Sequence, residues 1–352
     1  MPPGTAKPGE PSMLNLTTAR RAGAIALLSL TPGAPAQSIV GGGVLVDSDP
    51  TNDISAGASY NLKADQSRAI IGLATVGAGD AVDYFGIRMP AATYITAMTI
   101  PLASQPLGPF VNPTTAVRLE NFDGSAQYVL NSTGGTDQSG STPNSGGSVA
   151  RARPFSDTNI KVRVNSPQTG GYAVLVSVYT GDNGEFVEQG SNDGPATAIM
   201  LGLNLGGPKI GTAVIASGTD VDYFGVEMKR GQILAAVTTP CEGFPNDLST
   251  PDTVLDLIGT NGATVLVSND DAGTDQLGNN RGSAVRYRAT KDGRYFLRVK
   301  GFNASAIGRY ALTAALIEPP PGTECIADFN GDGLVDTNDL VTFLGQFGNP
   351  CP

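Results

Sequence analysis

The chain has 352 residues, a net charge of −10, no histidine and no tryptophan, and only 15% of its residues are charged. The missing histidine excludes Ser-His-Asp and Cys-His catalysis, histidine-ligated zinc and histidine acid–base chemistry. The negative charge argues against nucleic acid as a partner, because such binding needs Lys and Arg to neutralise phosphates. Glycine (46) and proline (25) are plentiful between short apolar runs, a composition typical of all-β domains.

Residues 1–36 carry the pattern of a secretory signal peptide, whose true start we place at Met13. Arg20-Arg21 precedes an apolar stretch over residues 22–30, and Ala34-Pro35-Ala36 matches a small-residue cleavage site. The stretch is too short to span a bilayer, which needs about 20 residues. No later segment is long and apolar enough to do so. We therefore expect a protein exported to the extracellular medium or the cell surface.

The region 37–318 contains an internal repeat with a period of about 140 residues, which indicates tandem domains. The matched segments keep their order and cover nearly the whole unit, so we interpret them as a duplication. The matches are Asn52-Asp53 with Asn192-Asp193, Asp80–Ile87 with Asp220–Val226, Gly135–Asp137 with Gly273–Asp275, Gly147–Arg151 with Gly282–Arg286, Lys161–Val164 with Leu297–Val299, and Gly171-Tyr172 with Arg309-Tyr310.

Each repeat reads as β-strands. Apolar side chains recur with period two over residues 172–178, 295–299 and 310–316, and glycine-rich turns separate such runs. This pattern predicts antiparallel sheets with one buried face, in a β-sandwich or jelly roll. The pairs Tyr84-Phe85 and Tyr223-Phe224 lie inside such strands, so we interpret them as structural rather than ligand-stacking.

The order of motifs in residues 190–318 resembles the bacterial pre-peptidase C-terminal domain. These motifs are Asn192-Asp193, Asp220–Phe224, Asp252–Leu257, Ser268–Asp271, Asp292–Val299 and Gly308–Leu312. The resemblance implies a non-catalytic β-sandwich of a secreted or surface protein, in a family whose members include binders of calcium or of a substrate polymer.

If this repeat follows the family, an acidic cluster in it is a possible second calcium site. Its members are Asp252, Asp256, Asn269, Asp270 and Asp271. Adjacent carboxylates repel one another, so either a cation or exposed turns explain the cluster. The first repeat has Thr114-Thr115 and Asn131-Ser132-Thr133 at the matching places, which leaves calcium in doubt there. Residues 131–147, rich in Ser, Thr and Gly, read as a long flexible loop.

The last part of the chain carries the pattern of a twelve-residue calcium loop. Oxygen-bearing side chains fall at loop positions 1, 3, 5, 9 and 12, and Gly333 occupies position 6, where the chain must turn sharply. The spacing predicts a Ca²⁺ site in which Leu334 ligates by its backbone carbonyl. Its ligands are Asp328, Asn330, Asp332, Leu334, Asp336 and Asp339.

An apolar stripe of Leu340, Phe343, Leu344 and Phe347 follows and predicts one short helix. No entering helix fits before the loop, because Pro319-Pro320-Pro321 lies only a few residues upstream. A loop without an entering helix, closed by Asp and followed by one helix, resembles a dockerin repeat.

The dockerin resemblance implies a cohesin-like partner, and it implies that Thr337 and Asn338 face that partner. Dockerins carry two such loops, whereas this sequence has one. Cys325 and Cys351 flank the module, and in an exported protein a disulfide between them would staple a unit too small to have a core. Cys241 is left over, as a buried thiol or an intermolecular one.

The expected organisation is all-β apart from the last module. It consists of residues 1–36 as signal peptide, 37–48 as an N-terminal segment, 49–182 and 183–318 as two β-sandwiches, 319–324 as a proline-rich linker, and 325–352 as the dockerin-type module.

The functional hypothesis is a non-catalytic, secreted or cell-surface calcium-binding protein. Its sandwiches would bind an extracellular polymer or a surface protein, and the terminal loop would tether or stabilise it. The alternative is an accessory or remnant of a secreted hydrolase. The least favoured reading is a carboxylate-dependent hydrolase, with acids from Asp220/Asp222 or Asp270/Asp271.

Overall fold

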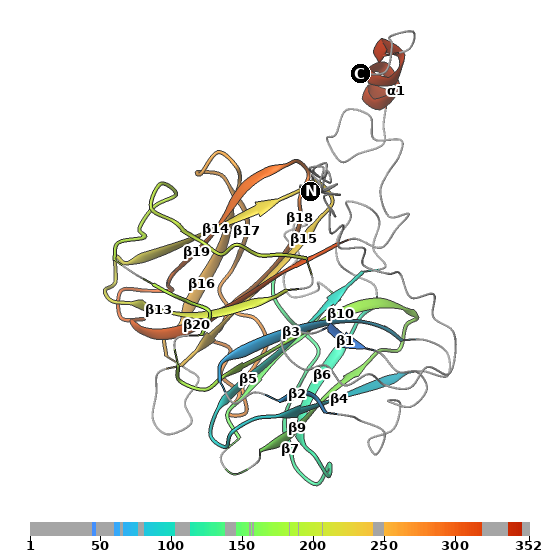
Figure 1. Ribbon diagram of the computed structural model, residues 1–352, viewed down its shortest axis with the longest axis vertical. Helices are drawn as coiled ribbons and strands as arrows, with labels where there is room; N and C mark the ends of the chain where they lie inside the picture. Colours follow the sequence, from blue (N-terminus) through green and yellow to red (C-terminus); the bar gives the residue numbers. More distant parts are fainter. Residues whose placement is uncertain are drawn as a thin grey trace, which may run out of the picture. The chain divides into compact units, whose positions relative to one another are not determined.

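The structure is a computed structural model, and it confirms the all-β prediction, with four five-stranded sheets that we describe as two sandwiches (Figure 1). The described residues are 44–46, 60–63, 66–76, 81–102, 113–137, 146–318 and 337–346, without the single positions 155, 157, 183, 189 and 206 and without 242–249. The predicted signal peptide and the predicted proline-rich linker lie outside them.

The first sandwich is built from two five-stranded sheets. Its inner sheet has the strand order β1-β3-β10-β5-β8, and its outer sheet has the order β2-β4-β9-β6-β7. β1 lies within the segment that was expected to precede the sandwich, and it pairs in parallel with β3. The bounds are β1 Val44–Val46, β2 Tyr60–Lys63, β3 Arg68–Val76, β4 Val82–Arg88, β5 Tyr94–Pro101, β6 Ala116–Asn121, β7 Gln127–Asn131, β8 Val149–Ala152, β9 Asn159–Asn165 and β10 Gly170–Tyr179.

The second sandwich repeats this topology strand for strand. Its inner sheet has the order β11-β13-β20-β15-β18, and its outer sheet has the order β12-β14-β19-β16-β17. Each number is ten higher than its counterpart, so the strand order of the second sandwich matches that of the first. The bounds are β11 Phe186–Val187, β12 Ile199–Met200, β13 Lys209–Ile215, β14 Val221–Met228, β15 Ile233–Pro240, β16 Thr253–Ile258, β17 Val265–Asn269, β18 Ala284–Arg288, β19 Gly293–Gly301 and β20 Gly308–Ile317.

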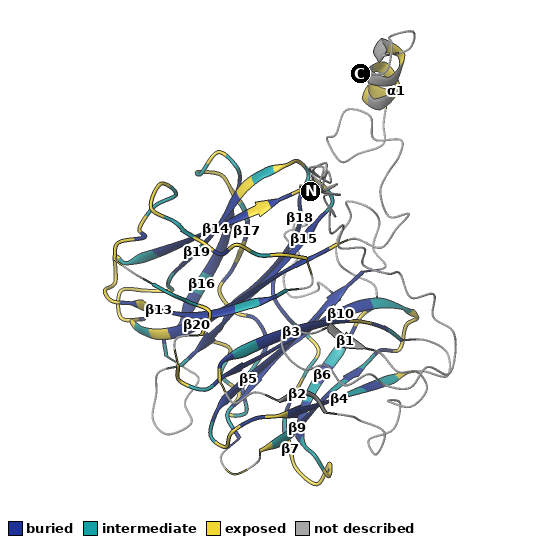
Figure 2. Cartoon of the chain, viewed as in Figure 1, coloured by how far each residue is buried: buried dark blue, intermediate teal, exposed yellow. Residues whose placement is uncertain are grey.

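Each sandwich has its own apolar core between its two sheets, visible as dark blue strands in Figure 2. Phe85 and Phe224, from the matched motifs, are 1% and 0% exposed in these cores, whereas Tyr84 is half-buried on the other side of its strand. The structural interpretation is therefore confirmed for the two phenylalanines, Phe85 and Phe224.

The inner sheets are buried on both faces, which the alternating pattern did not predict. Every residue of β5 and of β15 is buried. Met98 and Ile100 of β5 belong to one apolar cluster with Ala235 and Val237 of β15 and with Ile317. The two inner sheets therefore share a third core, and a sheet covered on both faces reads as a continuous apolar run.

Main-chain hydrogen bonds cross between the sandwiches in a reciprocal way. Thr136 N donates to Ala284 O at 3.0 Å, and Arg286 N donates to Thr136 O at 3.0 Å. In the opposite direction, Arg151 N donates to Thr274 O at 3.2 Å. Each sandwich therefore completes the edge strand of the other, because Arg151 lies in β8 and Arg286 in β18.

Two matched arginines are fully buried at this interface. Arg151 Nε donates to Thr238 O at 3.0 Å, and Arg286 Nε donates to Thr99 O at 3.1 Å. Burial lowers the pKa of Arg151 to about 9 and that of Arg286 to about 10, although nearby carboxylates oppose the shift. Each guanidinium thus satisfies carbonyls that would otherwise be buried without a donor.

Glycines make room for these arginines. A Cβ at Gly147 would lie 2.6 Å from Arg286 Nη2, and one at Gly282 would lie 2.7 Å from Arg151 Nη2. The predicted flexible loop over 131–147 is wrong at its ends, because Thr136 is 3% exposed and pairs with the other sandwich. Residues 138–145 of that loop lie outside the described residues.

The helix α1 spans Thr337–Gln346, in the region where the sequence predicts a short helix. Leu340, Val341 and Leu344 are exposed on it. Among the described residues, no helix is both long and apolar enough to cross a membrane.

Candidate functional site

The predicted C-terminal calcium loop lies almost wholly outside the described residues. Asp339 lies in α1, with its side chain outside the described part of the structure. Thr337 and Asn338, the predicted partner contacts, are exposed at the start of α1. The other predicted ligands and both predicted disulfide partners lie outside the described part: Asp328, Asn330, Asp332, Leu334, Asp336, Cys325 and Cys351.

The leftover cysteine is a half-buried thiol. Cys241 Sγ donates to Thr239 O at 3.0 Å, and the Cys241 carbonyl accepts a hydrogen bond from Tyr94 Oη at 3.1 Å. These contacts agree with the buried-thiol alternative for Cys241.

The five residues of the predicted second calcium cluster divide between opposite faces of one sheet. Asp256 pairs with Ser268 across β16 and β17, while Asn269 pairs with Leu255 one position along. Because neighbouring positions of a strand face opposite ways, Asp256 and Asn269 do not converge. Asp256 is held on the outer face by Arg298, whose Nε and Nη2 donate to it at 2.9 and 2.6 Å.

The remaining three acids of that cluster lie near one another. Burial raises the pKa of Asp271, and the neighbouring charges of Asp270 and Asp252 raise it further. The Arg281 guanidinium opposes this shift and also forms an ion pair with Asp252. The structure therefore narrows the cluster to three carboxylates, one of which already has a cationic partner.

A different acidic group forms around Asp222, at the start of β14. We call it the Asp222 group: Glu188, Asn192, Asp220, Asp222 and Tyr310. Asp222 and Tyr310 are both 0% exposed, and Tyr310 Oη donates to Asp222 Oδ2 at 2.7 Å. With its amide oriented so that both atoms are satisfied, Asn192 donates to Asp222 Oδ1 at 3.1 Å.

Main-chain donors fix the two other carboxylates of the Asp222 group. Glu188 Oε2 accepts a hydrogen bond from Val214 N at 2.8 Å, and Asp220 Oδ2 accepts one from Ala216 N at 2.5 Å. Both side chains are half-buried. Main-chain donors of β13 and of the residue after it thus fix Glu188 and Asp220, whose charges act on the Asp222 carboxyl.

The electrostatics of the Asp222 group disfavour a full set of negative charges. Burial raises the pKa of Asp222 to about 8, against the lowering effect of the Tyr310 hydrogen bond, and the charges of Glu188 and Asp220 raise it further. A hydrogen bond between the Asp222 and Glu188 carboxyls acts in the same direction. At neutral pH the group therefore holds a proton, in a position where a cation would serve the same purpose.

The first sandwich has the tyrosine–aspartate pair that matches Tyr310 and Asp222. Its described residues include no counterpart of Glu188. Tyr172 Oη donates to Asp83 Oδ2 at 2.6 Å, and both residues are 0% exposed. The sequence signal for this pair was present in the repeat, since Asp83 matches Asp222 and Tyr172 matches Tyr310. The contribution of Glu188 was missed, because nothing in the sequence brings it to the same strand end.

Among the described residues, no three acidic or cysteine side chains are arranged to hold a metal ion.

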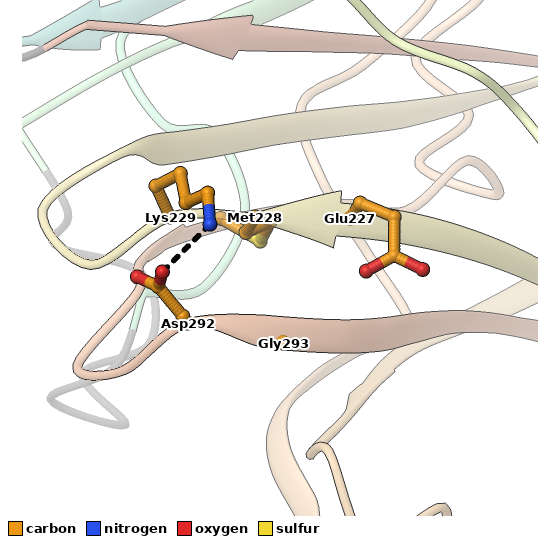
Figure 3. A pocket seen from close by; sticks show the side chains of 5 residues that line it. All are labelled: Glu227, Met228, Lys229, Asp292 and Gly293. Carbon is orange, nitrogen blue, oxygen red and sulfur yellow. Dashed lines mark hydrogen bonds and ion pairs between the residues drawn. The ribbon is translucent and has the colours of Figure 1, made fainter.

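A hollow of about 330 Å³ lies where β14 ends and β19 begins. Figure 3 shows Lys229 and Asp292 reaching toward each other there, and they form an ion pair of 2.8 Å. Both side chains are more than half exposed, which describes a solvated turn rather than a reaction centre.

No protein-family model matches the chain, and no curated protein sequence does so either. Among solved structures it is similar to the pre-peptidase C-terminal domain of a Bacillus anthracis collagenase, with 15% identity, a TM-score of 0.25, and coverage of 36% of this chain and 98% of that one. It is also similar to a periplasmic inhibitor of g-type lysozyme from Aeromonas hydrophila, with 13% identity, a TM-score of 0.23, and coverage of 34% and 95%. Function is therefore inferred from the side chains of this chain alone.

Proposed function

We propose that this chain is a non-catalytic, exported calcium-binding protein whose β-sandwiches hold an extracellular polymer or a surface partner. The observation that carries the proposal is the Asp222 group, in which the buried Asp222 carboxyl has its pKa raised to about 8 by burial and by the neighbouring charges of the half-buried Glu188 and Asp220. Ca²⁺ prefers oxygen ligands and would relieve the repulsion that the proton now relieves.

The burial of Asp222 supports binding rather than catalysis. A raised pKa near 8 would suit a general acid. A catalytic carboxyl must also come within hydrogen-bond reach of its substrate, and the Asp222 side chain is 0% exposed beneath Tyr310. A single ion needs less room than a substrate, and the Glu188 and Asp220 side chains of the group are half-buried rather than fully buried.

The C-terminal module is the second calcium site of the proposal. Its support is the spacing of Asp328, Asn330, Asp332, Asp336 and Asp339 around Gly333, and the helix α1 that follows. In this proposal calcium rigidifies the module, and the exposed Thr337 and Asn338 contact a cohesin-like or other surface protein.

Calorimetric titration with CaCl₂ of the chelator-stripped protein tests the calcium proposal. We expect two sites, of which Asp328→Ala/Asp332→Ala removes one and Asp222→Asn removes the other. Asp271→Asn is the matched control, because it removes a carboxylate of the other acidic cluster and should leave both sites. If Asp271→Asn instead of Asp222→Asn abolishes a site, the ion belongs to Asp252, Asp270 and Asp271. Heat from none of the proteins contradicts calcium binding altogether.

A further inference from the structure

The outer sheet of the first sandwich has a cluster of cations and aromatic rings on the face turned away from its core, where Lys161 is 2% exposed. We call this the basic face: Tyr84, Arg88, Arg118, Phe122, Lys161 and Arg163. Strand register places Tyr84 opposite Arg163, and Arg163 opposite Arg118. The basic face is therefore one continuous row across β4, β9 and β6.

Aromatic rings support the cations of the basic face. Lys161 Nζ lies 4.5 Å from the centroid of the Phe122 ring, and Arg163 Cζ lies 5.8 Å from that of Tyr84. These distances are within the range of cation–π attraction. Glu120 is the carboxylate inside the row, and it pairs with Arg118 at 2.7 Å.

Arg163 forms no ion pair with a carboxylate in the part of the chain that the structure describes. Its Nε is shielded from solvent and finds no hydrogen-bond acceptor among the described residues. A guanidinium presents a planar fork that fits the two oxygens of one carboxylate. Arg163 is half-buried, so its remaining surface is open to a ligand from the solvent side.

The second sandwich shows what completes this arrangement. There the matched row is Tyr223, Arg298 and Asp256, in the same register. Asp256 stands where the first sandwich has Arg118, and its carboxylate accepts hydrogen bonds from both Nε and Nη2 of Arg298. The second sandwich therefore supplies its own carboxylate, Asp256, at the position where the basic face of the first sandwich has Arg118.

We propose that the basic face binds an acidic polysaccharide, with a uronate carboxylate on Arg163 in the way that Asp256 lies on Arg298. This inference rests on the proposed polymer binding and names the class of polymer. The half-buried rings of Tyr84 and Phe122 border the row and offer contact to sugar rings, while regularly spaced carboxylates meet Arg118 and Arg88. Because the chain as a whole carries a net charge of −10, a polyanion is repelled elsewhere and binding is confined to this face.

Binding of polygalacturonate by the full chain, measured by calorimetry in EDTA at low salt, tests this proposal. EDTA removes calcium, so a failure here is separate from a failure of the calcium sites. We expect Arg163→Gln to weaken the Kd about tenfold or more, since a charge-assisted fork is lost. The Kd of Arg163→Lys should fall between that of the parent protein and that of Arg163→Gln, because lysine keeps the charge and loses the planar fork.

Arg118→Asp is the decisive variant, because it gives the first sandwich the carboxylate of the second. The introduced carboxylate should pair with Arg163 and abolish binding of polygalacturonate. The thermal melting curve should show that this variant is still folded. Arg294→Asp makes the same charge change on the outer sheet of the second sandwich and should leave the Kd within about twofold. Binding should also weaken strongly between 0.05 and 0.5 M NaCl, as the Debye length falls below about 5 Å.

Three outcomes would overturn the proposal. Equal binding of fully methyl-esterified polygalacturonate would show that carboxylates play no part. Equal losses from Arg118→Asp and Arg294→Asp would show an effect of overall charge. Tighter binding of poly-glutamate than of polygalacturonate, lost in Arg163→Gln, would assign the face to acidic peptides.

Discussion

The two sandwiches have the same topology, and each has an apolar core between its two sheets, yet their surfaces differ at matched positions. Arg163 and Arg298 occupy the same place, but only Arg298 faces a carboxylate, Asp256, within the sheet. Asp83 and Asp222 occupy the same place, and each accepts a hydrogen bond from a buried tyrosine. Duplication has thus kept the residues that hold the fold and changed the residues that decide charge.

The interface teaches a related lesson about which repeat motifs persist. The matched segments Gly147–Arg151 and Gly282–Arg286 contain the buried arginines and the glycines that admit them. Each motif acts on the opposite sandwich, because Arg151 bonds to Thr238 and Arg286 bonds to Thr99. The repeat is therefore preserved where the two copies contact each other reciprocally.

The largest effect is expected from breaking this reciprocity. Arg286→Ala leaves the carbonyls of Thr99 and Gly134 without a donor and opens a cavity at the buried interface, which should lower the free energy of unfolding by about 3–5 kcal/mol. Urea unfolding curves measure it. Arg294→Ala, at a residue whose side chain is 53% exposed, is the control and should stay within about 0.5 kcal/mol. A loss below about 1 kcal/mol in Arg286→Ala would contradict a structural role.

A smaller loss of unfolding free energy should distinguish the outer sheet of the second sandwich from that of the first. Arg298→Ala leaves the Asp256 carboxylate, whose side chain is 3% exposed, with Lys300 at 3.8 Å and a hydrogen bond from Ser268 Oγ, and should cost about 2–3 kcal/mol. The matched change Arg163→Ala leaves no carboxylate behind and should cost less than about 1 kcal/mol. Both are read from the same unfolding curves. Equal losses at the two positions would mean that the difference in partners has no energetic consequence.

The Asp222 group predicts a dependence of stability on pH. Burial and the neighbouring carboxyls raise the folded-state pKa of Asp222 to about 8, whereas the unfolded value is near 3.9. The folded state therefore binds the extra proton, and its stabilising contribution is complete below pH 4 and lost as the pH rises through 8. Without calcium, the unfolding free energy should fall with a slope of at most about 1.4 kcal/mol per pH unit between pH 5 and 8.

Asp222→Asn should remove most of that slope, because an amide does not titrate. Unfolding curves at a series of pH values in EDTA compare the variant with the parent. A parent whose stability rises from pH 5 to 8, or a variant with an unchanged slope, would show that Asp222 is not the titrating group.

The smallest effect is expected at the solvated turn beside the hollow in Figure 3. Lys229 and Asp292 are exposed, so water and salt screen their ion pair. Lys229→Ala should leave the urea midpoint unchanged. A clear shift of the midpoint would show that this turn is more than a solvated surface feature.

Sequence alone predicted the strands, the duplication and the last helix, because period-two alternation and an internal match are local signals. It did not predict the shared third core, since the partners of Met98 and Ile100 come from the other repeat. The predicted calcium cluster also grouped Asp256 with Asn269, although the two residues face opposite sides of the sheet. Strand pairing decides which face a residue takes, and a shift of one position reverses the faces. Glu188 joins Asp222 only through the fold, because β11 leads into it beside β13.

Proton release during calcium binding tests the central claim most directly. Calorimetry at pH 7 in two buffers of different ionisation enthalpy counts the protons released per ion. At the Asp222 group we expect release of about one proton, since the cation replaces the proton held by a carboxyl whose pKa is about 8. Asp222→Asn should lose this release while the C-terminal site still binds. Calcium binding with no proton released, or with the same release in Asp222→Asn, would contradict the assignment of the ion to the Asp222 group.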